Sequence, residues 1–321
     1  MIELLPTPKK CEVIDEKRHA LARTVCTKVA EWQPALDAFC ESFAKIFECE
    51  MQKGVCGGVE LVRDETLAKN AYKLESEGAL RIFASDAEGL NYGLATALQL
   101  LRVSGGEATV PAVRIEDRPD KDFRAFMIDV GFCWQPFDKM LKYIDLCHFY
   151  KINHLHMHIS DAAGYSLPSK AFPKLPNKGK HYTFEQVAEL NRYAAARGVK
   201  LVPEFECPGH ATALNRAYPE VFSNHADGEG ADFNLHGRTE VFGRKKRPYA
   251  AVHLEYGNVR KRNRLHAVEL AFAEMMLVNN SVIDKAIVMI VIRRKPKHEC
   301  LSAAEAFGKR FVIHQVAHAV V

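Results

Sequence analysis

From Phe123 onward, apolar runs alternate regularly with amphipathic stretches. The apolar runs cover 123–130, 154–160 and 200–206 and are short enough to be buried strands. The stretches between them, 136–151 and 184–198, repeat their apolar residues at helical spacing. Strands and helices that alternate with short connections predict parallel strands joined by right-handed crossovers. We therefore expect an α/β fold, either a doubly wound sheet or the opening of a (β/α)₈ TIM-type barrel.

The segment before residue 119 has a different pattern. An apolar run at 79–86 predicts a strand, and apolar residues from Leu90 to Leu101 recur at helical spacing. Gly105 and Gly106 are expected to end that helix, and 110–120 reads as an extended stretch with prolines. Strands and helices that share a core of their own predict a small α+β domain over 1–118, followed by the barrel segment 119–223.

Composition separates the last part of the chain from the rest. Residues 1–223 hold 28 Lys+Arg and 30 Asp+Glu, whereas 224–321 hold 16 and 10. This basic tail is poor in proline, and we predict no structure for it beyond a buried strand at 286–292. The net charge of +4 over 321 residues gives no reason to expect a nucleic acid partner.

No apolar run approaches the length needed to cross a membrane, so no membrane partner is expected. The first residues lack the charged and apolar regions of a signal peptide. The nine cysteines show no CxxC spacing and are expected to be reduced thiols. These observations together predict a cytoplasmic location.

Candidate chemistry lies where the predicted parallel strands end, because ligands bind at the carboxyl ends of such strands. Asp129 ends the first strand, Asp161 follows the second, and Glu204 and Glu206 end the third, with His210 just beyond. Carboxylates at buried strand ends are costly unless they are paired or functional. The competing interpretation is that these acids cap helices or pair with basic residues.

Three histidines on the second strand raise a separate possibility. His154, His156 and His158 share one face of the strand, and neutral imidazole is a common metal ligand. A metal-dependent hydrolase is therefore an alternative. However, three side chains at alternate positions of one strand are spread over too great a length to reach the same ion. A metal ion needs three or four convergent ligands. We predict that the row lines the barrel, and we expect no metal and no cofactor.

Several segments resemble glycoside hydrolase family 20, the β-N-acetylhexosaminidases. The resemblance covers roughly 1–223 and rests mainly on "KINHLHMHISD" and "KLVPEFECPGHA", with "GLNYGLATALQLL" and "IEDRP" in the first domain. It implies a (β/α)₈ barrel that removes terminal N-acetylhexosamine by substrate-assisted retention, in which the acetamido oxygen of the substrate attacks the anomeric carbon. An aspartate of the family orients that acetamido group, and the adjacent glutamate protonates the leaving oxygen.

The resemblance also implies roles for individual residues. Asp161 corresponds to a sugar-binding aspartate, Glu206 to an acid that supports the catalytic aspartate, and His210 to a histidine that lines the pocket. Asp129, Arg124 and His158 are candidate supporting residues. The partner implied is a carbohydrate with a terminal N-acetylhexosamine.

The sequence departs from the family pattern in three ways. Phe132 stands where the family has a sugar-binding arginine, and Ala162 stands where a second acid usually follows the first. No His-x-Gly-Gly-Asp-Glu motif occurs in 224–321, and the dipeptide Asp-Glu occurs only at 15–16 and 64–65. No catalytic residue is therefore identifiable. We expect this polypeptide to be inactive, and the second alternative is a non-catalytic carbohydrate-binding protein.

Overall fold

The computed structural model describes residues 2–206, 212–218 and 289–291. These residues form two compact units. The first unit comprises 2–126, 140–155 and 192–200; the second comprises 127–139, 156–191 and the described residues from 201 onward. No helix within the described ranges is both long and apolar enough to cross a bilayer.

The first domain is built on a mixed sheet of eight strands. Their order is β1-β8-β5-β6-β4-β2-β3, and β7 pairs with β8. The pairs β1–β8, β5–β8, β5–β6 and β7–β8 are antiparallel, whereas β6–β4, β4–β2 and β2–β3 are parallel. The strands are β1 (Lys10–Leu21), β2 (Thr24–Thr27), β3 (Gln52–Lys53), β4 (Val59–Arg63), β5 (Tyr72–Glu75), β6 (Leu80–Ala84), β7 (Arg102–Ser104) and β8 (Glu107–Asp117).

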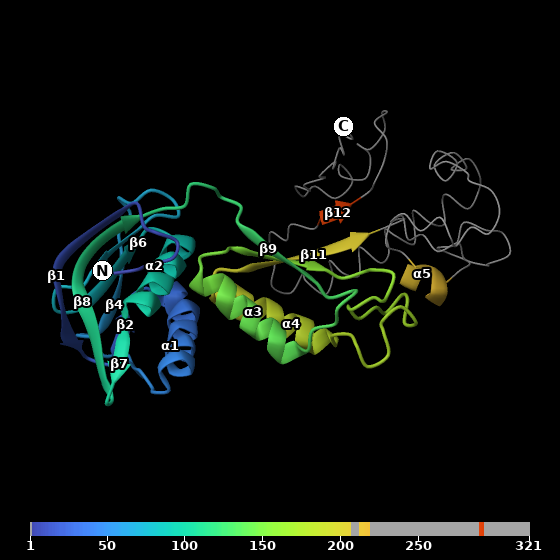
Figure 1. Cartoon of the computed structure of the whole chain (residues 1–321), viewed down its shortest axis with the longest axis horizontal. Coiled ribbons are helices and arrows are strands. Elements are labelled where there is room, and N and C mark those ends of the chain that lie inside the picture. The colour runs from blue at the N-terminus through green and yellow to red at the C-terminus, as the bar shows by residue number, and fades with distance from the viewer. Residues whose placement is uncertain (1, 207–211, 219–288, 292–321) are drawn as a thin grey trace. The chain divides into compact units, whose positions relative to one another are not determined.

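Two helices, α1 (Gln33–Phe47) and α2 (Ala87–Leu100), lie against one face of this sheet (Figure 1). A short 3-10 helix, η1 (Ala30–Trp32), leads into α1. Asp86 caps α2 by accepting a hydrogen bond from the Gly89 amide (2.8 Å). The helix then presents Leu90, Leu94 and Leu98 to the core, where all three are almost fully buried. Burial of apolar surface on this scale is the main favourable contribution to folding of the domain.

The sequence prediction for this domain is confirmed in part. The predicted strand at 79–86 is β6, the predicted extended stretch at 110–120 overlaps β8, and the predicted helix is α2, but α1 and the other six strands were not anticipated. Gly105 and Gly106 do not end α2. They have φ values of +58° and +81° and form the turn between β7 and β8. Glycine tolerates positive φ without steric cost, which suits a tight hairpin turn better than a helix end here.

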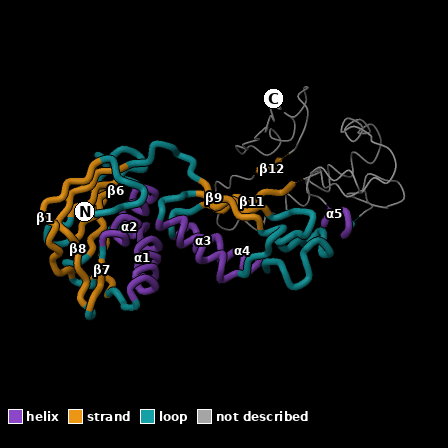
Figure 2. Tube along the Cα trace, viewed as in Figure 1, coloured by secondary structure: helices purple, strands orange, loops and turns teal. Residues whose placement is uncertain are grey.

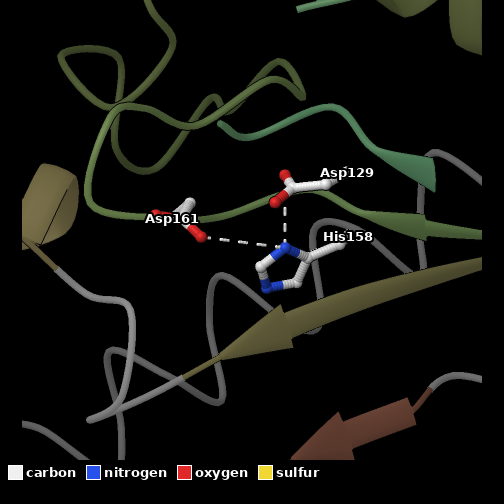
Figure 3. Close-up of side chains that lie close together, drawn as sticks. All are labelled: Asp129, His158 and Asp161. Atoms are coloured by element: carbon white, nitrogen blue, oxygen red, sulfur yellow. Dashed lines mark ion pairs between the residues drawn. The ribbon is translucent and has the colours of Figure 1, made fainter. Parts of the chain in front are cut away.

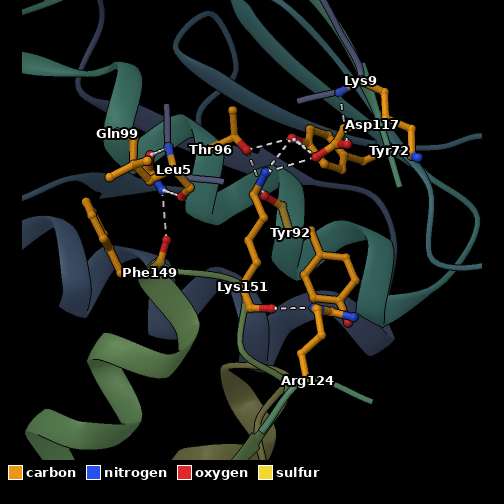
Figure 4. A network of polar contacts seen from close by, with 10 residues as sticks. All are labelled: Leu5, Lys9, Tyr72, Tyr92, Thr96, Gln99, Asp117, Arg124, Phe149 and Lys151. Atoms are coloured by element: carbon orange, nitrogen blue, oxygen red, sulfur yellow. Dashed lines mark hydrogen bonds and ion pairs between the residues drawn. The ribbon is translucent and has the colours of Figure 1, made fainter. Parts of the chain in front are cut away.

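A buried polar group, which we call the Lys151 cluster, lies inside the first unit and consists of Lys151, Tyr72, Thr96 and Asp117 (Figure 4). The Lys151 ammonium donates to the Tyr72 hydroxyl (2.9 Å) and to Asp117 Oδ2 (3.1 Å). The Tyr72 and Thr96 hydroxyls are 2.7 Å apart. Burial lowers the pKa of Lys151, and the Asp117 carboxylate opposes that shift. Burial and then Asp117 raise the pKa of Tyr72.

The second part of the chain alternates strands and helices (Figure 2). The elements are β9 (Ala125–Asp129), α3 (Phe137–Phe149), β10 (His154–His158), α4 (Phe184–Ala196), β11 (Lys200–Glu206) and α5 (Thr212–Ala217), with β12 (Met289–Val291) far along the chain. The sheet order is β9-β10-β11-β12, and β11 and β12 are parallel. Neighbouring strands joined through a helix are typical of parallel βαβ units. The predicted strand at 286–292 is thus present as β12.

The cysteine prediction is wrong for one pair. Cys26 and Cys56 form a disulfide, with their Cα atoms 5.3 Å apart. It connects β2 to the loop before β4, so two segments separated by 30 residues are tied at one edge of the first domain. Sequence spacing did not reveal it, because only the folded sheet brings β2 beside β4. Cys11, Cys40, Cys49, Cys133 and Cys147 are free thiols.

Candidate functional site

The candidate site forms where β9 and β10 end. The backbone amides of Val130 and Gly131 both donate to the His158 carbonyl, at 3.0 and 2.9 Å. This closes the turn after β9 onto the last residue of β10. A Cβ atom on Gly131 would lie 3.0 Å from backbone atoms of Ser160 and Asp161, so only glycine allows this approach without displacing the neighbouring chain.

The approach of the two strand ends brings together three side chains, Asp129, His158 and Asp161, which we call the strand-end cluster (Figure 3). His158 Nδ1 lies 3.2 Å from Asp129 Oδ1 and 3.9 Å from Asp161 Oδ2. The His158 and Asp161 side chains are 9% and 13% exposed, whereas that of Asp129 is 35% exposed. The cluster is therefore mostly buried but open to solvent on the side of Asp129.

Local backbone amides orient both carboxylates. The Phe132 amide donates to Asp129 Oδ1 at 2.8 Å, and the Ala162 amide donates to Asp161 Oδ1. The Asp161 amide also donates to the Gly164 carbonyl (2.9 Å), which makes a tight turn directly after the aspartate. Each carboxylate is thus held by the turn that follows its own strand, as is common for aspartate in turns.

The other two histidines of the row have different neighbours. His156 Nε2 lies 2.7 Å from Glu204 Oε2 of β11. His154 Nδ1 lies 2.8 Å from the Asn153 side-chain oxygen, and its ring packs on Phe123 with centroids 4.4 Å apart. Burial, and then the charge of Lys200, lowers the pKa of His154 to about 4. The three imidazoles therefore do not converge on one point.

The predicted residues fall into three groups. Asp129, His158 and Asp161 come together in the strand-end cluster. Glu206 ends β11, but its side chain and the whole of His210 lie outside the described residues. Arg124 precedes β9 and is not part of the cluster.

Arg124 has structural contacts instead. Its guanidinium lies over the Tyr92 ring, 4.9 Å from the centroid. It also donates to the backbone carbonyl of Lys151 (2.9 Å; Figure 4). A further hydrogen bond goes to the Lys121 carbonyl (2.6 Å). These contacts all lie within the first unit. A cation held over an aromatic face and bonded to carbonyls stabilises packing, so the contacts of Arg124 in this structure are those of a structural residue of the first unit.

Aromatic residues follow β9 directly. The Phe132 side chain is 67% exposed, so its ring is open to solvent. Trp134 packs against Tyr182 with ring centroids 4.5 Å apart, and the Tyr182 hydroxyl donates to the Gln135 carbonyl (2.7 Å). Sequence reasoning did not single out Gly131 or this ring pair. The available signal for Gly131 was a glycine placed two residues after an acid that ends a strand.

The arrangement can bind polar ligands in two ways. Carboxylate oxygens accept hydrogen bonds from hydroxyl and amide groups, as a sugar would offer. Alternatively, Asp129, His158 and Asp161 are the one group of three in the described ranges whose ligand atoms, all within 4.8 Å of one another, could hold a metal ion. Only one histidine of the row belongs to this group, so the row as such does not provide three ligands.

Comparisons with known proteins agree with this architecture. Residues 122–253 match the family model "Glycosyl hydrolase family 20, catalytic domain", and 1–118 match "Glycosyl hydrolase family 20, domain 2". The catalytic-domain match continues past Ser223, into the segment that the sequence analysis treated as a divergent tail. Together the two models span more than three quarters of the chain.

A curated relative, a β-hexosaminidase of Akkermansia muciniphila, is 34% identical over 194 residues, which is 54% of this chain and 39% of that protein. The chain therefore spans about two fifths of the length of this relative.

Two solved structures are also similar. One is an inactive mutant of an exo β-N-acetylglucosaminidase of Vibrio harveyi, with a TM-score of 0.73 and 20% identity over 96% of this chain and 50% of that one. The other is a mutant β-hexosaminidase of Streptomyces plicatus in complex with the product N-acetylglucosamine, with a TM-score of 0.63 and 26% identity over 72% of this chain and 50% of that one. The predicted fold class, a TIM-type barrel preceded by a small α+β domain, is confirmed.

Proposed function

Because the chain belongs to glycosyl hydrolase family 20, we propose that it carries the sugar-recognition part of a glycoside hydrolase of β-N-acetylhexosaminidase type. The strand-end cluster is the observation that supports this most directly. It lies at the carboxyl ends of β9 and β10, the edge at which barrels of this kind bind ligands, and within the residues that match the catalytic domain. The similar Streptomyces plicatus structure was solved with N-acetylglucosamine.

The ligand that we propose is a carbohydrate with a terminal N-acetylhexosamine. Its acetamido N–H and ring hydroxyls are hydrogen-bond donors, and the carboxylates of Asp129 and Asp161 offer acceptors held in place by backbone amides. Glu206 and His210 remain proposed contacts on the grounds of the motif alone. Neither a nucleic acid nor a membrane is part of the proposal.

We further propose that this polypeptide recognises the sugar without hydrolysing it. The Asp-Glu dipeptide that performs the chemistry in the family occurs only at 15–16 and 64–65, outside the catalytic-domain match. The division into 1–118, 119–223 and 224–321 also stays a proposal. It rests on the change in composition after residue 223 and on the absence of the family's Asp-Glu motif beyond it, and the first boundary is supported by family models that cover 1–118 and begin again at 122.

Calorimetry and an activity assay on the full chain test both statements. We expect N-acetylglucosamine to bind, glucose to bind more weakly because it lacks the acetamido group, and Asp161→Ala to abolish binding. The chain should not hydrolyse an aryl N-acetyl-β-glucosaminide above background. Turnover near ~10 s⁻¹, typical of enzymes, would refute the non-catalytic part, and absence of binding in the folded wild-type chain would refute the sugar site.

The cytoplasmic location stays a prediction. The Cys26–Cys56 disulfide counts against it, because structural disulfides persist mainly in oxidising compartments. Thiol trapping at the moment of cell lysis, followed by mass spectrometry, would show whether this pair is oxidised where the chain is made. A reduced pair would agree with the cytoplasm.

A further inference from the structure

His158 stands between the two carboxylates of the strand-end cluster. Its Nδ1 atom is the ring nitrogen that faces Asp129 Oδ1 (3.2 Å) and Asp161 Oδ2 (3.9 Å) (Figure 3). Ionised carboxylates can only accept hydrogen bonds. A nitrogen that faces two acceptors is favourable only if it carries a proton, so the chemistry of the neighbours fixes which nitrogen of His158 is the donor.

The two carboxylates repel each other at this distance. All three ligand atoms of the cluster lie within 4.8 Å of one another, and the cluster is largely shielded from water. Like charges this close destabilise the ionised forms unless a donor or a cation lies between them. An Nδ1–H group in that place can donate a hydrogen bond to Asp129 (3.2 Å), and its partial positive charge, 3.9 Å from Asp161, offsets the repulsion between the two carboxylates.

His158 contacts both the turn that follows β9 and the turn that follows β10. Its carbonyl accepts the amides of Val130 and Gly131, which fixes the turn after β9. Its side chain then connects that turn to Asp161, which opens the turn after β10. One residue thus links both ends of the site, through its carbonyl on one side and through its ring on the other.

From these contacts we propose that His158 is a positioning residue, whose Nδ1–H group holds the Asp129 and Asp161 carboxylates in the arrangement that receives the N-acetyl sugar. This inference rests on the proposed sugar site. His158 acts through the two aspartates and needs no contact with the sugar itself. His156, two residues earlier on β10, belongs to a separate pair, in which its Nε2 lies 2.7 Å from Glu204 Oε2.

The first test reads the protonation of the ring and does not depend on sugar binding. The full chain is labelled with ¹⁵N-histidine, and the His158 resonances are assigned by comparison with the His158→Asn variant. We expect Nδ1 to carry a proton at neutral pH. An unprotonated Nδ1, or stoichiometric metal in elemental analysis of untagged protein, would overturn the proposal because Nδ1 would then be an acceptor or a metal ligand.

The second test uses two amide variants that differ in which ring nitrogen they imitate. In His158→Asn the side-chain nitrogen can occupy the position of Nδ1, whereas in His158→Gln it reaches the position of Nε2. We expect N-acetylglucosamine affinity within about threefold of wild type for Asn and at least about tenfold weaker for Gln, with both variants folded by circular dichroism.

The possible failures are distinguishable. If the two variants bind equally, with either unchanged or equally reduced affinity, the positioning role is refuted while the sugar site stands. If the wild-type chain itself does not bind, the proposed function fails, and the NMR measurement still decides the role of Nδ1.

Discussion

The Lys151 cluster and the strand-end cluster combine the same kinds of group in opposite settings. In both, a side-chain nitrogen lies close to an aspartate oxygen: Lys151 Nζ is 3.1 Å from Asp117, and His158 Nδ1 is 3.2 Å from Asp129. In the first, Lys151 and Asp117 are 6% and 10% exposed, and hydroxyls of Tyr72 and Thr96 complete the network. In the second, Asp129 is 35% exposed and two carboxylates share one imidazole. The Lys151 cluster therefore serves the fold, whereas the strand-end cluster is accessible to a ligand.

Balance of charge explains the difference. The Lys151 cluster has one cation for one carboxylate, and its members are hydrogen-bonded to one another, so it offers a ligand nothing. The strand-end cluster places two carboxylates beside one imidazole and is open to solvent on the side of Asp129. Carboxylates at an accessible strand end can accept hydrogen bonds from the donor groups of a ligand.

Removal of the buried cation should have the largest effect. Lys151→Met keeps the length of the side chain and leaves Asp117 buried without its cation, so we expect the free energy of unfolding to fall by about 3–5 kcal/mol. Urea denaturation measures it. Lys10→Met is the control, because Lys10 and Glu116 form an exposed pair that should contribute about 1 kcal/mol or less. Equal effects for both lysines would contradict the structural role of the cluster.

The Cys26–Cys56 disulfide is a second structural feature expected to stabilise the first domain. Replacement of Cys26 and Cys56 by alanine should lower the free energy of unfolding by about 3–4 kcal/mol, since the unfolded chain gains the entropy of an open loop of 30 residues. The measurement is denaturation without reductant. Cys11→Ser, at an exposed free thiol, should change stability by about 0.5 kcal/mol or less. A loss of similar size in both would show that the bond itself is not responsible.

Acid should weaken the first unit through His148. Burial lowers the pKa of His148 to about 4, while its Nδ1 is bonded to the Arg197 carbonyl (2.9 Å). The folded-state pKa is below the ordinary value of 6.5, so the unfolded chain binds the proton first. Its contribution is complete above about pH 6.5 and decreases as the pH falls toward 4, by roughly 2 kcal/mol at pH 5.

Urea denaturation at pH 7 and pH 5 measures this loss. His148→Asn keeps a donor toward the Arg197 carbonyl but cannot titrate, so the difference between the two pH values should shrink by roughly 2 kcal/mol. An unchanged pH dependence in the variant would assign the acid sensitivity to other groups, of which His154 is the next candidate because its pKa is lowered to about 4 as well.

The smallest effect on stability is expected at the strand-end cluster. Asp161→Asn keeps the shape of the side chain and removes one of two repelling charges, so we expect the free energy of unfolding to change by about 1 kcal/mol or less. The same variant should weaken sugar binding. A loss of stability as large as that of Lys151→Met would show that the cluster is structural, and the contrast between the two clusters would disappear.

Much of the site could be predicted from sequence because it depends on position along strands. Asp129 and Asp161 follow apolar runs, and the ends of neighbouring parallel strands meet at one edge whatever the loops do. His158 was included as a supporting residue for the same reason. By contrast, Arg124 differs from them by standing at the beginning of its strand, and its contacts with Tyr92 and Lys151 depend on packing within the first unit.

Several features could be deduced from the order of residues alone: the alternation of strands and helices after Phe123, the α+β character of 1–118, the acids at the strand ends and the resemblance to family 20. Local periodicity and motif spacing contain this information. Other features became visible only in the folded chain: which acids lie beside His158, the close approach of the two strand ends at Gly131, the pairing of Cys26 with Cys56, and the burial of Lys151 beside Asp117. These are contacts between residues far apart in the chain, and they arise from packing and close approach, which no local pattern encodes.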